Sequence, residues 1–404
     1  MKKVLKKIHL WLSVPTGIVI TLVCFSGAML AFEKEITEAI KPELYFVKDA
    51  KGEPIPMQQL MEKVEETLPD SVSISGVTVF ADSTRTYQVS LSKPRRASIY
   101  VNQYTGEVTG RSERLPFFNT MFHLHRWLLG SSSGVGKLLT GICALALAFI
   151  LVTGILMWLT NRNKPLKTSL AIHVTKGWGR FWHDLHVAGG IYATIFLLAM
   201  ALTGLTWSFS WYRTGFYACF GVESSEKGGA HGGGNSHGEG RNNHEGKRGE
   251  SRGEGRGEGR GEGRGEGRGN EFYHEEGYEF HRRSPYRHWD DVLNEVALKN
   301  PGYRQITLKP EVAEVVPEGR LSMRATDKYS YDRRSGEITD VQLYSAGEKD
   351  TKVRSGIYMV HTGSWGGIIT RILNFLAALI GATLPLTGYW LWIRRLTRKR
   401  HQQA

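Results

Sequence analysis

Four long apolar runs constrain the fold of this chain more than any other feature. They cover residues 8–32, 135–160, 183–210 and 368–393. A helix needs about 20 apolar residues to cross a hydrocarbon core roughly 30 Å thick, and each run reaches that length. Helices are the expected spanning structure because they satisfy their backbone polar groups internally. The sequence therefore predicts a membrane α-helical protein with four transmembrane helices.

Basic residues beside these runs predict the orientation of the helices. Lysine and arginine crowd three segments, which are residues 1–7, 161–182 and 394–404. The positive-inside rule places these segments, and with them both termini, in the cytoplasm. The segments 33–134 and 211–367 are then extracytoplasmic. Membrane topology accounts for the formal charge of +13, so the expected partner is a lipid membrane and not a nucleic acid.

Histidines stand at the start of the first and third runs. When His9 is aligned with His186, the pair Ser26-Gly27 falls on Thr203-Gly204. Two spans with the same histidine at the same depth suggest a pair of side chains that face each other. Neutral imidazoles are common metal ligands, and two of them can hold a haem iron axially. The alternative is that each histidine is only a satisfied interfacial residue.

A second histidine pair is predicted from the other two spans. His125 precedes the second span and His361 precedes the fourth, and both spans carry a Thr-Gly, at Thr153-Gly154 and Thr387-Gly388. The duplication therefore pairs His125 with His361 at the outer face. Three further histidines are alternative ligands: His123 for His125, and His173 or His183 for His186.

Two basic residues follow the second histidine pair into the membrane. Lys137 comes twelve residues after His125, and Arg371 comes ten residues after His361. These positions suit the anionic propionates of a haem, which need charged hydrogen-bond partners. Equally, both side chains can reach the membrane surface along their aliphatic stems without binding a ligand.

The two extracytoplasmic segments share one plan. Apolar residues with helical period at 57–68 precede β-rich stretches at 77–79, 86–91 and 98–101. A helical pattern at 289–298 is likewise followed by strands, and residues 101–108 match residues 331–338. Each half of the chain is thus span, outer α+β domain and span, which predicts two tandem repeats.

Residues 223–270 consist mainly of Gly, Glu, Arg, Ser and His. Such a composition cannot bury a core, so this insert is expected to be a disordered linker, with metal binding by its histidines a less favoured alternative. The three cysteines form no CxxC or CxxCH motif. Iron–sulfur clusters and covalently attached c-type haem are therefore disfavoured.

In order and spacing these motifs resemble the PepSY-associated transmembrane family, inner-membrane proteins linked to iron and siderophore uptake in Gram-negative bacteria. The resemblance rests on His9-Leu-Trp11, Ser26-Gly27, Leu124-His125-Arg126, Asp184-Leu185-His186, His361-Thr-Gly363 and Leu384-Pro-Leu-Thr-Gly388. It implies two PepSY-like extracytoplasmic domains, in 33–134 and 211–367. It also implies a multi-pass protein of the bacterial inner membrane with two b-type haems, in some members a ferrisiderophore reductase.

Two functional hypotheses follow. In the first, one haem b lies between His9 and His186 near the cytoplasmic face and another between His125 and His361 near the outer face. Electrons then pass to a periplasmic ferric siderophore or other ferric chelate. Quinol or a cytoplasmic reductase is the expected donor, because the chain has no GxGxxG or flavin motif. In the alternative, a non-enzymatic PepSY membrane protein regulates a peptidase, senses a signal or assists a transporter.

Overall fold

The computed structural model describes residues 2–94, 97–160, 169–223, 284–320 and 322–403. The insert 223–270 lies outside the described residues apart from Glu223, and so do His231, His237 and His244. Most of the first half of the predicted cytoplasmic loop, residues 161–168, is outside them as well.

Four helices among the described residues are long and apolar enough to cross a membrane. They occupy Lys2–Leu30, Val135–Leu159, Trp178–Ser208 and Ser364–Thr397. The prediction of four spans is therefore confirmed. The first and fourth spans extend beyond the apolar runs because their basic flanks continue the helix: α1 is Lys2–Leu30, and α13 is Gly367–Gln403.

The third span consists of two α-helices joined by a π-helical turn. It begins as α8 (Trp178–Asp184), continues as the π-helical turn η1 (Leu185–Gly189), and ends as α9 (Gly190–Ser208). His186 lies in the π-helical turn. Such turns are rare and occur frequently at functional sites, because they change the direction in which a side chain leaves the helix.

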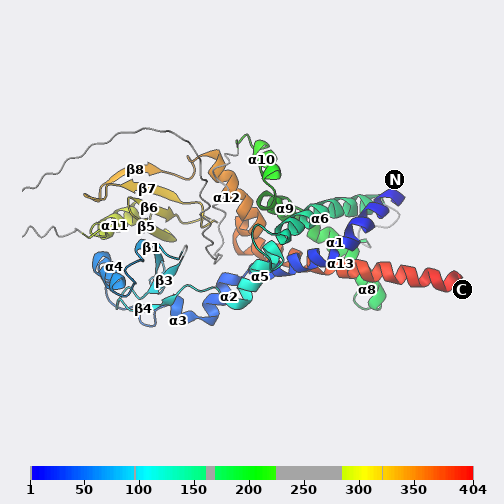
Figure 1. Ribbon diagram of the computed structural model, residues 1–404, viewed down its shortest axis with the longest axis horizontal. Helices are drawn as coiled ribbons and strands as arrows, with labels where there is room; N and C mark the ends of the chain where they lie inside the picture. Colours follow the sequence, from blue (N-terminus) through cyan, green and yellow to red (C-terminus); the bar gives the residue numbers. More distant parts are fainter. Residues whose placement is uncertain (1, 95–96, 161–168, 224–283, 321, 404) are drawn as a thin grey trace, which may run out of the picture. The chain divides into compact units, whose positions relative to one another are not determined.

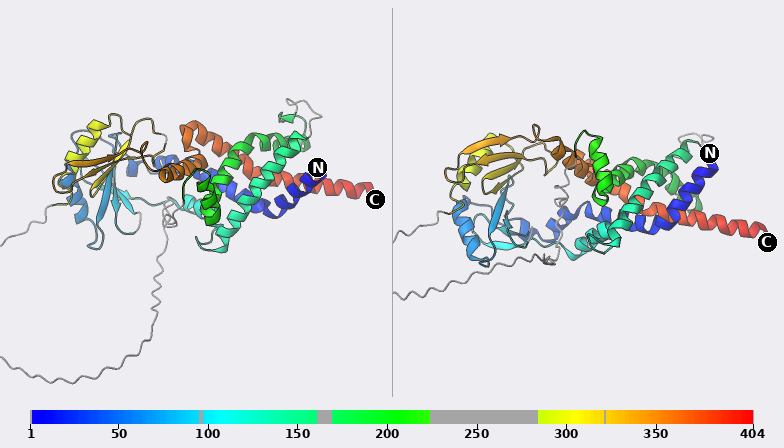
Figure 2. Two further views of the ribbon diagram at one scale, coloured as in Figure 1. Left: turned by 90° about the horizontal axis from the view of Figure 1, so that it is seen from above. Right: turned by 45° about the horizontal axis from the view of Figure 1, so that its top comes forward.

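The four spans pack around a small apolar core. Helix α1 contacts α13 and α6 (Val135–Leu159), and α9 contacts the same two helices (Figures 1 and 2). The buried residues of this core are Ile20, Cys24, Cys143, Leu151, Ala193, Leu197, Ala377 and Ala382. Gly381 allows close approach, since a Cβ there would lie 2.8 Å from Leu197. Membrane helices commonly associate through such small residues.

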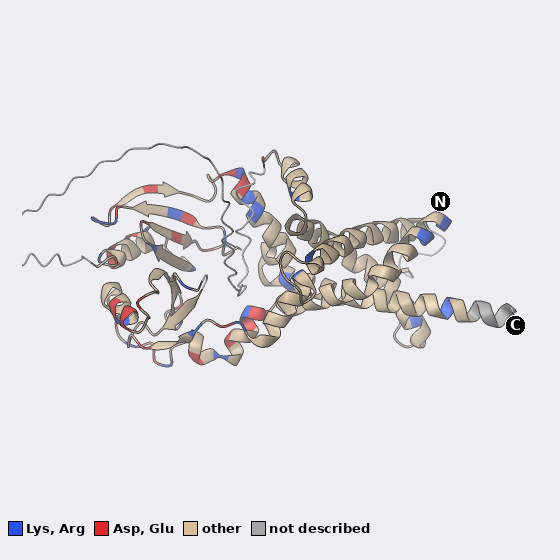
Figure 3. Ribbon diagram, in the orientation of Figure 1, with Lys and Arg blue, Asp and Glu red and all other residues tan. Residues whose placement is uncertain are grey.

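The distribution of charge agrees with a membrane-spanning bundle. Figure 3 shows long stretches of the spans without charged residues, and blue Lys and Arg positions on the ribbon near the start of α1 and in α13 before its grey end. Large apolar side chains face outward from the spans, among them Ile18, Phe149 and Ile195, which are 65%, 57% and 71% exposed. Lipid is the solvent in which such exposure is favourable.

Two shorter helices lead into the second and fourth spans. Helix α5 (Pro116–Trp127) precedes α6, and α12 (Lys349–Thr362) precedes the 3-10 turn η3 (Ser364–Gly366) and α13. Each ends at a residue with left-handed backbone, Leu128 (φ 49°) and Gly363 (φ 75°). A left-handed residue terminates a helix and redirects the chain. His125 and His361 lie in the last turns of these two helices.

The two segments outside the spans form a single antiparallel sheet of eight strands. Its first four strands are β1 (Ile74–Phe80), β2 (Tyr87–Leu91), β3 (Ser98–Val101) and β4 (Val108–Arg111). Its other four are β5 (Gln305–Lys309), β6 (Val312–Val316), β7 (Asp327–Tyr331) and β8 (Ile338–Gln342). Their order is β4-β3-β2-β1-β5-β6-β7-β8 (Figure 1).

The two expected α+β domains therefore share one sheet instead of having one each. The junction is the antiparallel pair β1–β5, where Thr78 lies opposite Thr307 and their hydroxyls are 2.9 Å apart. Among the described residues of these segments, the remaining helices are α2 (Glu33–Ile40), α3 (Pro42–Tyr45), α4 (Met57–Glu66), α10 (Ser210–Ala218) and α11 (Trp289–Lys299).

One hydrophobic core underlies both halves of the sheet. Helix α4 contributes Met57, Leu60 and Val64 at helical spacing, and α11 contributes Trp289 and Val292. Alternate residues of the strands complete this core. In β2, for example, Tyr87, Val89 and Leu91 are buried in it. Alternate residues of a strand face one side of a sheet, so each strand supplies one apolar face to the shared core.

Candidate functional site

The structure brings His9 and His186 together. His9 comes from α1 and His186 from η1, and their ring centroids lie 6.4 Å apart with an angle of 86° between the ring planes. Both side chains lie inside the helical bundle, where an unpaired polar group is costly.

Each imidazole of this inner pair is held by a neighbouring helix. His9 Nδ1 lies 3.1 Å from the carbonyl oxygen of Ile150 and 3.1 Å from the hydroxyl of Thr153. His186 Nδ1 lies 3.1 Å from the carbonyl of Leu384 and 2.9 Å from the hydroxyl of Thr387. Because a carbonyl only accepts, Nδ1 carries the proton and donates, and Nε2 keeps its lone pair.

The structure brings His125 and His361 together in the same way. Their ring centroids are 6.1 Å apart, with an angle of 59° between the planes. His125 Nδ1 donates to the carbonyl of Val23 at 2.9 Å. His361 Nδ1 donates to the carbonyl of Met200 at 2.9 Å and lies 3.2 Å from the Thr203 hydroxyl. Nε2 is again the nitrogen left for a ligand.

A glycine lies against each of the four imidazoles. A Cβ added to the glycine would lie close to the Cε1 atom of the ring. In the inner pair the distance would be 3.6 Å from Gly154 to His9 and 3.3 Å from Gly388 to His186. In the second pair it would be 2.8 Å from Gly27 to His125 and 3.1 Å from Gly204 to His361. The recurring Ser/Thr-Gly motif thus has a structural explanation. The hydroxyl assists in holding Nδ1 at three of the four sites, and glycine leaves room for the ring.

The two pairs lie at different levels of the bundle. His9 and Val23, which binds His125, are 14 residues apart on α1, and His186 and Met200 are also 14 apart. At 1.5 Å per residue this spacing corresponds to roughly 20 Å along the helix axes. A hydrocarbon core of about 30 Å can accommodate both levels.

The spacing of each pair fits an iron atom between the rings. With imidazole–metal bonds of about 2 Å in a linear arrangement, two ring centres lie roughly 6 Å apart. The observed centroid distances of 6.4 Å and 6.1 Å agree with this value. The donor set, two neutral imidazoles fixed through Nδ1, is that of a bis-histidine haem.

A bare metal ion fits less well. Among the described residues no group of three or more His, Cys, Asp and Glu side chains is arranged to hold a metal ion. Two axial histidines suffice for haem because the macrocycle itself supplies the other four ligands. Cys24, Cys143 and Cys219 are all free thiols and belong to neither histidine pair.

Arg371 has a protein partner in this structure. Its guanidinium donates to both carboxylate oxygens of Glu35 at 2.7 and 2.9 Å and to the carbonyl of Ala31 at 2.6 Å. Burial favours the neutral acid and is the largest single influence, but the hydrogen bonds from Arg371, a backbone hydrogen bond and the positive charges of Arg371 and Lys34 together hold the pKa of Glu35 below its ordinary value. Lys137 is half-buried in the first turn of α6, without an acidic partner among the described residues.

The three alternative histidines have other neighbours. His123 packs edge-on against Trp127, with ring centroids 4.9 Å apart. His173 and His183 both bond through Nδ1 to the carboxylate of Asp184, at 2.8 and 3.3 Å. The pairs observed in the bundle are therefore those formed by His9, His186, His125 and His361.

A family model described as the PepSY-associated TM region matches residues 6–395, nearly the whole chain. The chain belongs to the PepSY-associated transmembrane family. The short motifs that suggested this family are the ones that build the two histidine pairs: each contributes an imidazole, its acceptor or its glycine. Comparison with curated proteins gave no match.

In this member of the PepSY-associated transmembrane family, the sequence did not indicate the backbone acceptors. These are the carbonyls of Ile150, Leu384, Val23 and Met200. Each acceptor residue is followed three positions later by a hydroxyl residue. Thr153 follows Ile150, Thr387 follows Leu384, Thr203 follows Met200, and Ser26 follows Val23. The recurring Ser/Thr-Gly was the available signal, but its role as a histidine support required the tertiary contacts.

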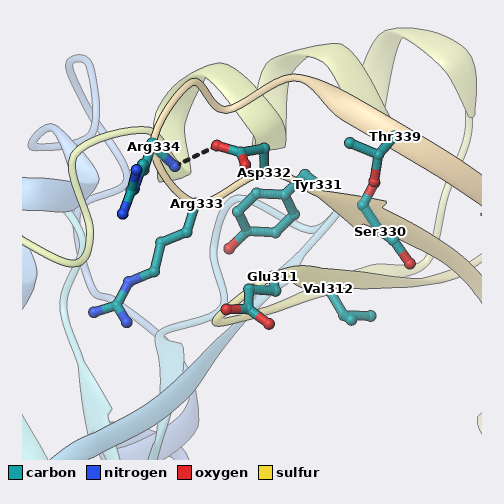
Figure 4. Close-up of a pocket in the computed structure, with 8 residues that line it drawn as sticks. All are labelled: Glu311, Val312, Ser330, Tyr331, Asp332, Arg333, Arg334 and Thr339. Carbon is teal, nitrogen blue, oxygen red and sulfur yellow. Dashed lines mark hydrogen bonds between the residues drawn. The ribbon is translucent and has the colours of Figure 1, made fainter.

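A cavity of about 540 Å³ lies elsewhere, in the sheet (Figure 4). Its walls are formed by Glu311, Val312, Ser330, Tyr331, Asp332, Arg333, Arg334 and Thr339. Figure 4 shows the carboxylate of Asp332 accepting the backbone N–H of Arg334, a turn contact of 2.7 Å. None of the four paired histidines lines this cavity.

Proposed function

We propose that this protein is a membrane-embedded electron carrier that holds two b-type haems and reduces a ferric chelate. The observation that carries the proposal is the repetition of one arrangement at two levels of the bundle. At each level two imidazoles face each other at a distance that suits an iron atom, and each is fixed through Nδ1. A single interfacial histidine needs no such partner.

The chain's own residues would position and tune the cofactors. His9 and His186 would hold one haem, and His125 and His361 the other. When bound, each haem supplies a one-electron couple, and its potential responds to axial ligands and to the hydrogen bonds behind them. The carbonyls and hydroxyls at Nδ1 make the imidazoles better electron donors to iron. The glycines beside the rings keep side chains out of the space next to them.

Topology supports an outward direction of electron transfer. Under the positive-inside rule the basic ends of α1 and α13 are cytoplasmic, so the His9–His186 pair lies on that side. The pair His125 and His361 then lies toward the periplasm, on the side of the membrane where the chain forms the eight-stranded sheet. A ferric siderophore or other ferric chelate in the periplasm would accept electrons there, at the outer surface of the bacterial inner membrane. Reduction favours iron release because oxygen donors bind the harder ferric ion better.

The proposal is tested by the visible spectrum of the purified protein. We expect about two non-covalent haems per chain, with the six-coordinate, low-spin spectrum that two axial imidazoles produce. The haems should be extractable into acidic organic solvent, because no CxxCH motif attaches them. A colourless protein from haem-replete cells would refute the proposal and favour the non-enzymatic alternative.

A further inference from the structure

Helix α10 (Ser210–Ala218) follows the third span directly but does not continue it. Phe209, the residue between α9 and α10, has an extended backbone with φ −126° and ψ 126°, which interrupts the helical dihedrals. The chain therefore turns, and α10 runs across the direction of the spans (Figures 1 and 2). The ring of Phe209 packs against α6, where a Cβ added at Gly141 would lie 2.8 Å from it. This contact holds the start of α10 at the end of the bundle.

One side of α10 packs against the protein. Tyr217 is only 5% exposed and forms a small apolar cluster that includes Ile357 of α12. Phe216 packs against the same cluster, together with Trp207 of α9 and Val353 of α12. Helix α10 is therefore held in place by two neighbouring helices and is not a loose extension of the third span.

The opposite side of α10 is exposed and carries no charge. Trp211 is 64% exposed, and Gly215 and Ala218 are exposed as well. Residues four and seven positions apart share one face of a helix, so these three residues form a single face. A Cβ added at Gly215 would meet no atom within 4 Å. Arg213 is the one charged residue of α10, and it points to another side, because residues two positions apart do not face the same way.

The aromatic content of this junction is typical of a membrane interface. The ring of Trp211 stacks on Phe209 with centroids 5.8 Å apart, and it lies 5.8 Å from the ring of Tyr212. Tryptophan and tyrosine are enriched where a membrane meets water. The exposed face of α10 begins three residues after Ser208, the last residue of α9, so it continues the lipid-exposed surface of the spans. A helix that runs across the spans at this position can lie in the plane of the interface.

We propose that α10 lies in the membrane interface at the end of the bundle where α9 ends, with Trp211, Gly215 and Ala218 facing the lipid. The partner is the bilayer itself, at the boundary between head groups and acyl chains. This inference goes beyond the proposed function and does not depend on haem. Because α10 packs against α12, its contact with lipid also supports the helix that carries His361.

The cysteines of the chain allow a label to be placed on α10. Cys24 and Cys143 are buried, whereas Cys219 is exposed at the C-cap of α10. A Cys219→Ser variant should therefore take up no thiol-reactive label in the folded protein. In this background, Ala218→Cys places a fluorescent label on the face that carries Trp211.

Two further cysteines provide matched references in the same background. Ile195→Cys is the reference for lipid, because Ile195 lies in the third span and is 71% exposed. Ser335→Cys is the reference for water, because Ser335 is exposed in the turn between β7 and β8. Each labelled protein is placed in lipid nanodiscs, so that a water-soluble quencher reaches both sides of the bilayer.

Quenching by three agents then reports the position of each label. The agents are aqueous iodide, a lipid with a nitroxide on its head group, and a lipid with a nitroxide deep in its acyl chain. An interfacial helix inserts only into the boundary region, so the label at position 218 should be quenched at least about twofold more by the head-group nitroxide than by either other agent. The label at position 195 should respond most to the deep nitroxide, and the label at position 335 to iodide alone.

Two results at position 218 would overturn the proposal. Quenching by iodide and by neither lipid, as at position 335, would show that this face of α10 stands in water. Protection from all three agents would show that protein covers it, for example a second copy of this chain.

Substitution of Trp211 tests the face directly. Trp211→Phe keeps an apolar ring and should leave the quenching pattern at position 218 unchanged. Trp211→Asp places a charge in the interface, so iodide quenching there should rise by at least about twofold. Since Trp211 is largely exposed, both variants should fold, and size-exclusion chromatography checks this. Identical quenching in the two variants would contradict contact between Trp211 and lipid.

Discussion

At the residue scale, the four paired histidines each use one ring nitrogen for the protein and leave the other for a ligand. The Nδ1 donor bonds to backbone carbonyls measure between 2.9 and 3.1 Å. Backbone acceptors are a robust support, because no single side-chain substitution removes them. The histidines themselves, and the glycines against them, are therefore the sensitive positions.

Substituting either histidine of one pair should remove the same single haem. We expect His9→Ala and His186→Ala each to lose the same haem, and His125→Ala and His361→Ala each to lose the other, so that every variant retains about one haem per chain. Haem quantification and the spectrum of each variant check this. His183→Ala is the control and should keep both haems. If every single variant lost both haems, the cause would be general misfolding and not ligand loss.

The glycine beside His125 should be as sensitive as the histidine. In Gly27→Ala the new methyl group would lie 2.8 Å from His125 Cε1, so the ring must move away from its ligand position. We expect loss of the outer haem, or conversion to a high-spin spectrum, with the inner haem unchanged. Gly356→Ala on α12 is the matched control, because nothing lies within 4 Å of its added Cβ. An unaltered spectrum of Gly27→Ala would contradict the assignment.

At the scale of elements, helix α4 begins without a capping side chain of its own. Pro56 stands at its N-cap, and the carboxylate of Asp290 on α11 accepts the backbone N–H of Met57 at 2.8 and 3.0 Å. The two halves of the sheet are thus joined by a helix cap as well as by the β1–β5 pair. Burial raises the pKa of Asp290 above its ordinary value, although the N–H groups of Met57 and Gln58 act in the opposite direction.

Substitution of Asp290 should reveal this cap. The raised pKa of Asp290 means that the folded state binds the proton more tightly than the unfolded state. The contribution of Asp290 to the free energy of unfolding is therefore greatest at low pH. It falls as the pH rises from 3.8 to the pKa of the folded state, and it is constant at higher pH. Asp290→Asn keeps an acceptor without the charge and should equal or exceed wild type at neutral pH. Asp290→Ala should lose about 1–2 kcal/mol. Denaturant unfolding of the detergent-solubilised protein at several pH values measures both, and equal stability of the two variants would contradict the capping role.

At the scale of the whole molecule, the two histidine levels form a relay only if both are occupied. Dithionite-reduced protein should be reoxidised by a ferric siderophore, with the ferrous product trapped by a chelator. In His125→Ala or His361→Ala the remaining inner haem should be reoxidised at least about tenfold more slowly, because much of a roughly 30 Å core separates it from the chelate. Equal rates in these variants and in wild type would rule out the outward relay.

The sequence by itself determined the elements that depend on local pattern. Apolar runs of membrane length located all four spans, and helical and alternating periods located α4, α11 and the strands β1, β2 and β3. The alignment of His9 with His186 also found two residues that face each other in the bundle. These features can be predicted from the sequence because periodicity and span length are properties of consecutive residues.

Tertiary structure decided everything that depends on which segments meet. Two outer segments with similar patterns were equally compatible with two sheets, and the pairing of β1 with β5, in which Thr78 lies opposite Thr307, makes them one. The acceptors of the four imidazoles are backbone carbonyls, which every residue possesses, so no residue type marks them. Charge and depth made Arg371 a candidate partner for a haem propionate, but they did not indicate Glu35, its carboxylate partner in the fold, 336 residues away along the chain. Contacts between segments that are distant in the sequence follow from the packing of the whole chain. The pattern of residue types within one segment therefore does not predict them.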